Sequence, residues 1–110
     1  MTAQTLQSTT ALSAQATSDE KYVLRLYVAG ATSRSRRAIL NINAICMEHL
    51  QGKYDLEVID IYQKPALAKD EQIIAAPTLI KRLPLPLRRI IGDLSDREKV
   101  LSALGLNRET

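Results

Sequence analysis

One cysteine and one histidine are the only candidates for thiol or metal chemistry in this sequence of 110 residues. Cys46 and His49 stand three positions apart, a spacing that brings side chains together on a helix. A structural metal site takes about four ligands, and the chain has no further cysteine or histidine. Cys46 also falls on an apolar helical stripe, where it is expected to be a small buried side chain. We therefore predict no metal and no cofactor.

The other signatures of catalysis are missing as well, so the sequence predicts a protein that is not an enzyme. The four glycines stand singly, which leaves no phosphate-binding loop. With a single histidine in the chain, a Ser-His-Asp catalytic triad is not expected. The carboxylates of Asp93 and Asp96 are sufficiently explained by the positive end of a helix that begins beside them.

The charged residues say more about function than the search for catalytic groups. The 15 basic and 12 acidic residues leave a net charge of +3, too small to indicate nucleic-acid binding by itself. The chain has no Phe or Trp, so it also lacks a stacking surface for single strands. No apolar stretch approaches the length of a membrane span. Basic residues are concentrated in two segments of the sequence: Arg34, Arg36 and Arg37, and Lys81, Arg82, Arg88 and Arg89. One interpretation is that they form a cationic face for a protein partner, because arginine is enriched at protein interfaces. The other is that they form a solvated rim, as exposed lysine and arginine usually do.

The elements that must position these residues begin with a βαβ unit. Residues 22–28 are short, β-branched and aromatic, which indicates a buried strand. Thr32 or Ser33 is available to cap a helix over residues 34–50, which has apolar positions at helical spacing. A second strand over residues 56–61 implies a parallel pair with a right-handed crossover.

The second half is expected to contain a short helix, a hairpin and a last helix. Pro65 suits the first turn of a helix that runs to about Ile74. Strands over residues 75–80 and 87–91 flank a turn at 83–86, because its two prolines lack donors. Ser95 and Glu98 form a predicted capping box before a helix to about Leu104. Local preferences in residues 72–76 and 99–104 are ambiguous, so tertiary contacts must decide them.

These elements predict a single α/β domain with the thioredoxin-like order βαβαββα. Residues 21–106 form the domain, residues 1–20 a disordered N-terminal tail, and residues 107–110 a C-terminal tail. A thioredoxin-like oxidoreductase needs its thiols where the first strand meets the first helix. This chain has Thr32, Ser33 and Ser35 there, so oxidoreductase activity is not expected.

Four segments resemble the KaiB family: YVLRLYVAG at 22–30, VID at 58–60, APTL at 76–79 and, above all, LPLPLRRIIGDLSDREKV at 83–100. The resemblance implies a cytoplasmic, non-enzymatic clock or signalling protein that docks on a KaiC-type hexameric ATPase. It implies a homo-oligomer, dimer or tetramer, whose C-terminal half has an alternative βαββααβ ground-state fold. KaiA, or a histidine kinase with a KaiB-like sensor domain, is implied as a further partner. An adaptor of a non-standard KaiC in stress signalling is the alternative.

The resemblance also implies roles for individual residues. Partner-binding cations map onto Arg25, Arg37, Lys81 and Arg88. Pro77 takes the cis-proline position of thioredoxin-like folds. The segment that differs between the two folds contains Pro84, Pro86, Gly92, Ala103 and Gly105. The chain departs from the family at Glu57, where an interface lysine is usual, and over residues 103–108.

Overall fold

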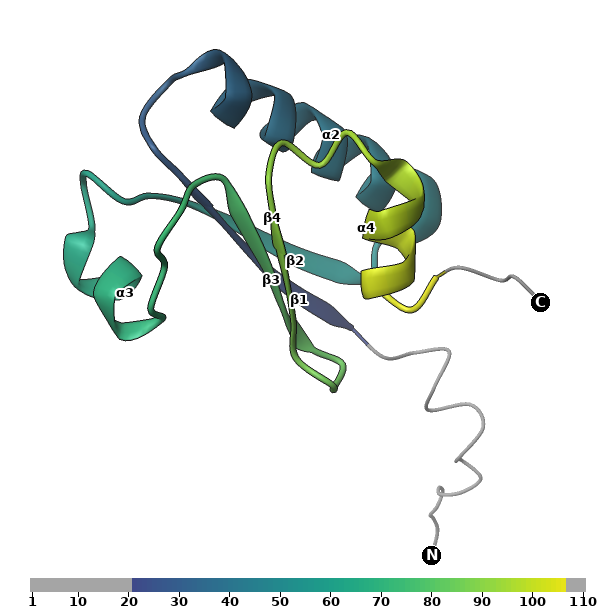
Figure 1. The fold of residues 1–110 in the computed structure, drawn as a ribbon. Helices are drawn as coiled ribbons and strands as arrows, with labels where there is room; N and C mark the ends of the chain where they lie inside the picture. Colours follow the sequence, from purple (N-terminus) through teal and green to yellow (C-terminus); the bar gives the residue numbers. More distant parts are fainter. Residues whose placement is uncertain (1–20, 107–110) are drawn as a thin grey trace, which may run out of the picture.

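A computed structural model describes residues 21–106, which fold into one four-stranded sheet with helices on both faces (Figure 1). The strands lie in the order β2-β1-β3-β4. The strands are β1 (Tyr22–Val28), β2 (Tyr54–Asp60), β3 (Thr78–Leu83) and β4 (Arg88–Ile91), and the helices are α2 (Ser33–His49), α3 (Pro65–Asp70) and α4 (Arg97–Ala103).

The predicted βαβαββα order is confirmed. Strands β1 and β2 are parallel and are connected through α2, while β3 is antiparallel to both β1 and β4. Strand β1 is central, as its apolar sequence predicts. Thr32 caps α2, because its Oγ1 accepts the Ser35 N–H at 3.1 Å. None of the helices in residues 21–106 is long and apolar enough to cross a membrane.

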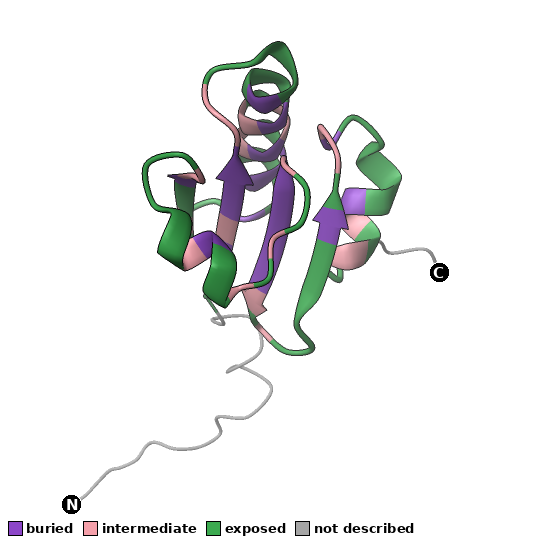
Figure 2. Ribbon diagram, turned by 60° about the vertical axis from the view of Figure 1, so that its left-hand side comes forward, coloured by how far each residue is buried: buried purple, intermediate pink, exposed green. Residues whose placement is uncertain are grey.

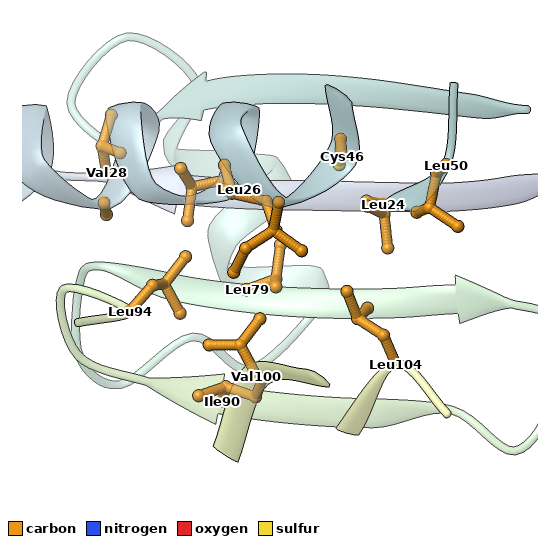
Figure 3. Packing of buried hydrophobic residues seen from close by; sticks show 13 residues of the cluster. Leu24, Leu26, Val28, Cys46, Leu50, Leu79, Ile90, Leu94, Val100 and Leu104 are labelled. Carbon is orange, nitrogen blue, oxygen red and sulfur yellow. The ribbon is translucent and has the colours of Figure 1, made fainter. Parts of the chain in front are cut away.

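Successive side chains of a strand point to opposite faces of the sheet, so the buried residues form one core cluster on each face. Helices α2 and α4 cover one face, and α3 covers only part of the other (Figures 1 and 2). The larger cluster, between the sheet and α2 and α4, includes Leu24, Leu26 and Leu79 (Figure 3). The smaller one lies beside α3 and consists of Tyr27, Ile59, Ala68 and Ile80.

The predicted end of α3 near Ile74 is wrong, because the helix ends at Asp70. Gln72 has a φ of +57° and donates its N–H to the Lys69 carbonyl at 3.0 Å, while the Ile73 N–H reaches the Ala68 carbonyl at 2.9 Å. This pair of bonds is a Schellman motif. It ends the helix although no glycine is present, and the next strand begins only at Thr78.

The predicted capping box at Ser95 is also wrong. Helix α4 begins at Arg97, and Asp96 is its cap, accepting the Lys99 N–H on Oδ1 at 3.2 Å. Ser95 instead donates its own N–H to Asp93 Oδ1 at 3.1 Å. The two carboxylates on either side of Ser95 satisfy these donors, so the serine hydroxyl is not needed as the cap.

Candidate partner-binding surface

Three arginines from three strands meet at the C-terminal end of α3; we call Arg25, Arg82 and Arg89 the arginine cluster. Arg82 Nη1 lies 2.5 Å from Glu71 Oε2, and Arg25 Nη1 lies 3.5 Å from the same oxygen. Arg89 donates to the Glu71 carbonyl at 2.6 Å. These arginines therefore hold the end of α3 against the sheet.

Arg25 has two further partners on this face. Its Nη1 lies 3.4 Å from the Tyr27 hydroxyl, an interaction that raises the pKa of the guanidinium. Its Nε lies 3.5 Å from the carboxylate of Glu57, the residue directly opposite on β2. Glu57, at the position where the resemblance implies an interface lysine, thus pairs with a neighbouring strand.

Lys81 and Arg88 lie on the opposite face of the sheet. They are cross-strand partners in the β3–β4 ladder, and alternation places them on the same face as Leu79 and Ile90 of the larger cluster. Only 5% of Lys81 is exposed, whereas Arg88 is exposed. Within residues 21–106, Arg88 forms no ion pair.

Arg37 stands apart from the other three cations, near the start of α2. Its Nε lies 3.1 Å from Asp93 Oδ2 in the loop that joins β4 to α4. The structure therefore does not bring the four predicted partner-binding residues together on one surface.

Sequence reasoning noted Arg82 and Arg89 as cations beside the proline turn but did not select them as site residues. The alternation of side chains along β3 and β4 could have identified them, because successive residues of a strand point to opposite faces of the sheet. It places Arg82 and Arg89 on the α3 face, and Lys81 and Arg88 on the α4 face.

The connection between β3 and β4 exposes a group of leucines, which we call the hairpin tip: Leu83, Leu85 and Leu87. All three are exposed, Leu85 most of all at 74%. An apolar hollow beside the tip is lined by Lys21, Val23, Leu83, Pro84 and Leu85. An apolar hollow with exposed leucines at its edge is typical of an interaction site.

The other singled-out residues occupy turns and helix ends. Pro77, Pro84 and Pro86 all follow cis peptide bonds, as expected for Pro77. Gly92 follows β4 with a φ of +125°. Ala103 is the last residue of α4, and Gly105 ends that helix in a second Schellman motif with a φ of +75°.

The position of a thioredoxin thiol pair holds hydroxyl groups instead. Ser35 is buried, and its Oγ accepts the Ala29 N–H at 3.2 Å. Cys46 is buried on α2, and desolvation raises its pKa to about 11, so the thiol is protonated at neutral pH. Within residues 21–106, no three His, Cys, Asp or Glu side chains are grouped to hold a metal ion.

Comparison with solved structures supports the fold. The chain superposes on the N-terminal domain of SasA from Synechococcus elongatus with a TM-score of 0.67 and 20% identity, covering 97% of this chain and 99% of that domain. It superposes on the germline thioredoxin Deadhead of Drosophila melanogaster with a TM-score of 0.63 and 15% identity, covering 84% and 86% of the two chains. The fold is thioredoxin-like.

Sequence comparison identifies the family. The KaiB domain model matches residues 25–106. The circadian clock oscillator protein KaiB of Synechococcus elongatus is 56% identical over 85 residues, covering 77% of this chain and 83% of that protein. The circadian clock protein KaiB3 of Synechocystis sp. is 51% identical over 86 residues, covering 78% and 84%. The chain therefore belongs to the KaiB family.

Proposed function

We propose that this protein is a regulatory binding protein of a Kai-type clock or signalling system, acting in the cytoplasm without catalysing a reaction. It docks on a KaiC-type hexameric ATPase and modulates the ATPase's phosphorylation state and output. The observation that carries the proposal is 51–56% identity to circadian clock KaiB proteins over most of the chain. The absence of a reactive thiolate at Cys46 favours this role over a thioredoxin-like oxidoreductase.

Arg88 and the hairpin tip are the best candidates for the contact with the ATPase. Arg88 is exposed and forms no ion pair within the described part of the chain. Leu87, directly before it, and Leu85, three residues before it, are exposed. An apolar centre with a charged rim is the usual composition of a protein interface. Lys81 is buried in this fold, so it supports the sheet rather than touching a partner.

The test is size-exclusion chromatography of the protein with KaiC-type hexamers from the same host and ATP, followed by a titration of binding. We expect Arg88→Glu to weaken binding about tenfold, mainly through slower association. Lys64→Glu is the matched control, because Lys64 is also exposed and its side chain forms no capping bond with α3. Equal binding by both variants and the unmodified protein would exclude Arg88 from the interface. Failure of the unmodified protein to bind any host hexamer would overturn the proposed docking.

We also propose that the C-terminal half exchanges between this arrangement and the βαββααβ fold. The ambiguous local preferences of residues 72–76 and 99–104 support this, since a separation of about 2.7 kcal/mol leaves a minor state near 1%. Backbone amide spectra should show two slowly exchanging sets of signals, or one set that changes when the ATPase binds. A single set, unchanged by binding, would mean that this chain keeps one fold.

An adaptor role with a non-standard KaiC in stress signalling is the second candidate. The observation that favours it is the Glu57–Arg25 ion pair. Glu57 stands where the resemblance implies a partner-binding lysine, and its carboxylate pairs with Arg25 of the same chain. Under this proposal, capture of KaiA is lost while the ATPase is still bound. Adding KaiA, or the sensor domain of the histidine kinase, to the preformed complex separates the two roles.

A further inference from the structure

Two side chains of α2 hold the loop that precedes α4, and we call Arg37, Asn41 and Asp93 the latch. Arg37 Nε lies 3.1 Å from Asp93 Oδ2. One helical turn later, Asn41 Nδ2 donates to the Asp93 main-chain carbonyl at 2.8 Å. Asp93 Oδ1 accepts the Ser95 N–H. All three acceptor oxygens of Asp93 are thus bonded, two of them to side chains of α2.

The loop needs such support because the backbone of one of its residues is unfavourable. Leu94 has a φ of +64°, and a leucine rarely adopts this left-handed region. Gly92, with a φ of +125°, adopts its conformation without a steric penalty. Leu94 is nevertheless 4% exposed and belongs to the larger core cluster with Val100 and Leu104 of the α4 segment (Figure 3). The latch fixes Asp93, the residue between Gly92 and the strained Leu94.

We propose that Arg37 serves partner binding as a positioning residue, through Asp93, rather than by touching the partner. In this proposal the latch holds the loop at 92–96 and so sets the placement of β4, which carries Arg88, and of α4. The binding part of the proposal rests on the proposed docking on a KaiC-type ATPase. The structural part, control of the α4 segment by the latch, does not.

Direct contact is the competing explanation, since the Arg37 side chain is 54% exposed. The two explanations predict opposite results for Asp93→Asn. If Arg37 touches the partner, removing the charge of Asp93 releases the guanidinium and leaves binding unchanged or tighter. If the latch acts, Asp93→Asn weakens binding as Arg37→Gln does. Asn41→Ala sharpens the contrast, because Asn41 has no charge to offer and acts only on the Asp93 carbonyl.

The experiment compares Arg37→Gln, Asp93→Asn, their double variant and Asn41→Ala, with Arg36→Gln as control. Arg36 is an exposed arginine of the same helical turn and forms no ion pair within residues 21–106. Amide hydrogen exchange of residues 94–104 in the free protein should accelerate about two- to fivefold in each latch variant and stay unchanged in the control.

Binding to the KaiC-type hexamer should then weaken by a similar factor in each latch variant. The double variant should bind the hexamer no more weakly than the more affected of the two single variants, because both changes break the same interaction. Unchanged exchange in all latch variants overturns the latch. Faster exchange with unchanged binding by Asp93→Asn and Asn41→Ala overturns its role in docking. If the unmodified protein does not bind, the proposed function fails, while the exchange measurement still decides whether the latch exists.

Discussion

Arg82 and Glu71 are joined through Nη1 and Oε2 at 2.5 Å, and this contact fastens the end of α3 to strand β3. Helix α3 is six residues long, and it contributes only buried Ala68 and half-buried Leu67 to the smaller core cluster. So little buried apolar surface contributes little stability. The position of α3 on the sheet therefore depends on the arginine cluster around Glu71.

Glu71→Gln should destabilise the protein by about 1–2 kcal/mol, because it removes the charge that Arg25 and Arg82 share in a partly buried site. The measurement is urea unfolding at neutral pH. Glu57→Gln is the control, since Glu57 is more exposed and pairs with Arg25 alone; we expect a loss below about 1 kcal/mol. Equal losses in the two variants would show that Glu71 has no special role in holding α3.

Asp93 gives the protein an acid-sensitive contribution to stability. Its hydrogen bonds with Ser95, and then that with Arg37, lower the pKa of the carboxyl. A lowered folded-state pKa contributes stability above the unfolded value, about 3.9, which is lost as the pH falls through the folded-state pKa.

Asp93→Asn should consequently reduce the urea midpoint at pH 7 and have less effect as the pH is lowered below 4. Parallel unfolding titrations of the two proteins between pH 7 and pH 2.5 test this. A difference in midpoint that stays constant over the whole range would mean that the charge of Asp93 contributes nothing.

Cys46 should react slowly while the protein is folded. Burial raises its pKa to about 11, and the reactive species is the thiolate. At pH 8 we expect an aromatic disulfide reagent to modify the thiol at least about 100-fold more slowly in buffer than in urea. Because the folded-state pKa is raised, the related stability is complete below the unfolded value, near 8.5, and is lost as the pH rises toward 11. Rapid modification of the folded protein would contradict the burial.

Gln72 and Gly105 occupy the same left-handed position in the Schellman motifs of α3 and α4, with φ of +57° and +75°. Gln72→Gly should stabilise the protein by about 0.5–1 kcal/mol, since glycine adopts this region without a steric penalty. Gly105→Ala should destabilise it by a similar amount. A Cβ at position 105 would meet nothing within 4 Å, so the loss would report backbone strain alone. Thermal unfolding of both variants checks the opposite signs.

The sequence by itself determined the βαβ unit, the hairpin and the order of the elements. Residues 22–28 are short, β-branched and aromatic, residues 34–50 have apolar positions at helical spacing, and the two prolines of the 83–86 turn exclude strand interior. Local patterns suffice for these elements because the composition, the spacing and the flanking turn residues of each segment all favour the same secondary structure. Four segments, above all the run over residues 83–100, were also enough to recognise the KaiB family.

Only the tertiary structure decided where α3 ends, which residue caps α4 and how the cations are grouped. Gln72 takes a left-handed conformation while Ile73 packs on the smaller core cluster, a contact that no local propensity contains. Asp96 caps α4, while Asp93 is bonded to Arg37 and Asn41 of α2 and accepts the Ser95 N–H on its other carboxylate oxygen. Lys81 is buried although its charge predicts exposure, because the register of β3 turns it toward the α4 face. The packing of Ile73, the bonds from α2 to Asp93 and the register of β3 all join residues far apart in the sequence, and local patterns do not encode such contacts.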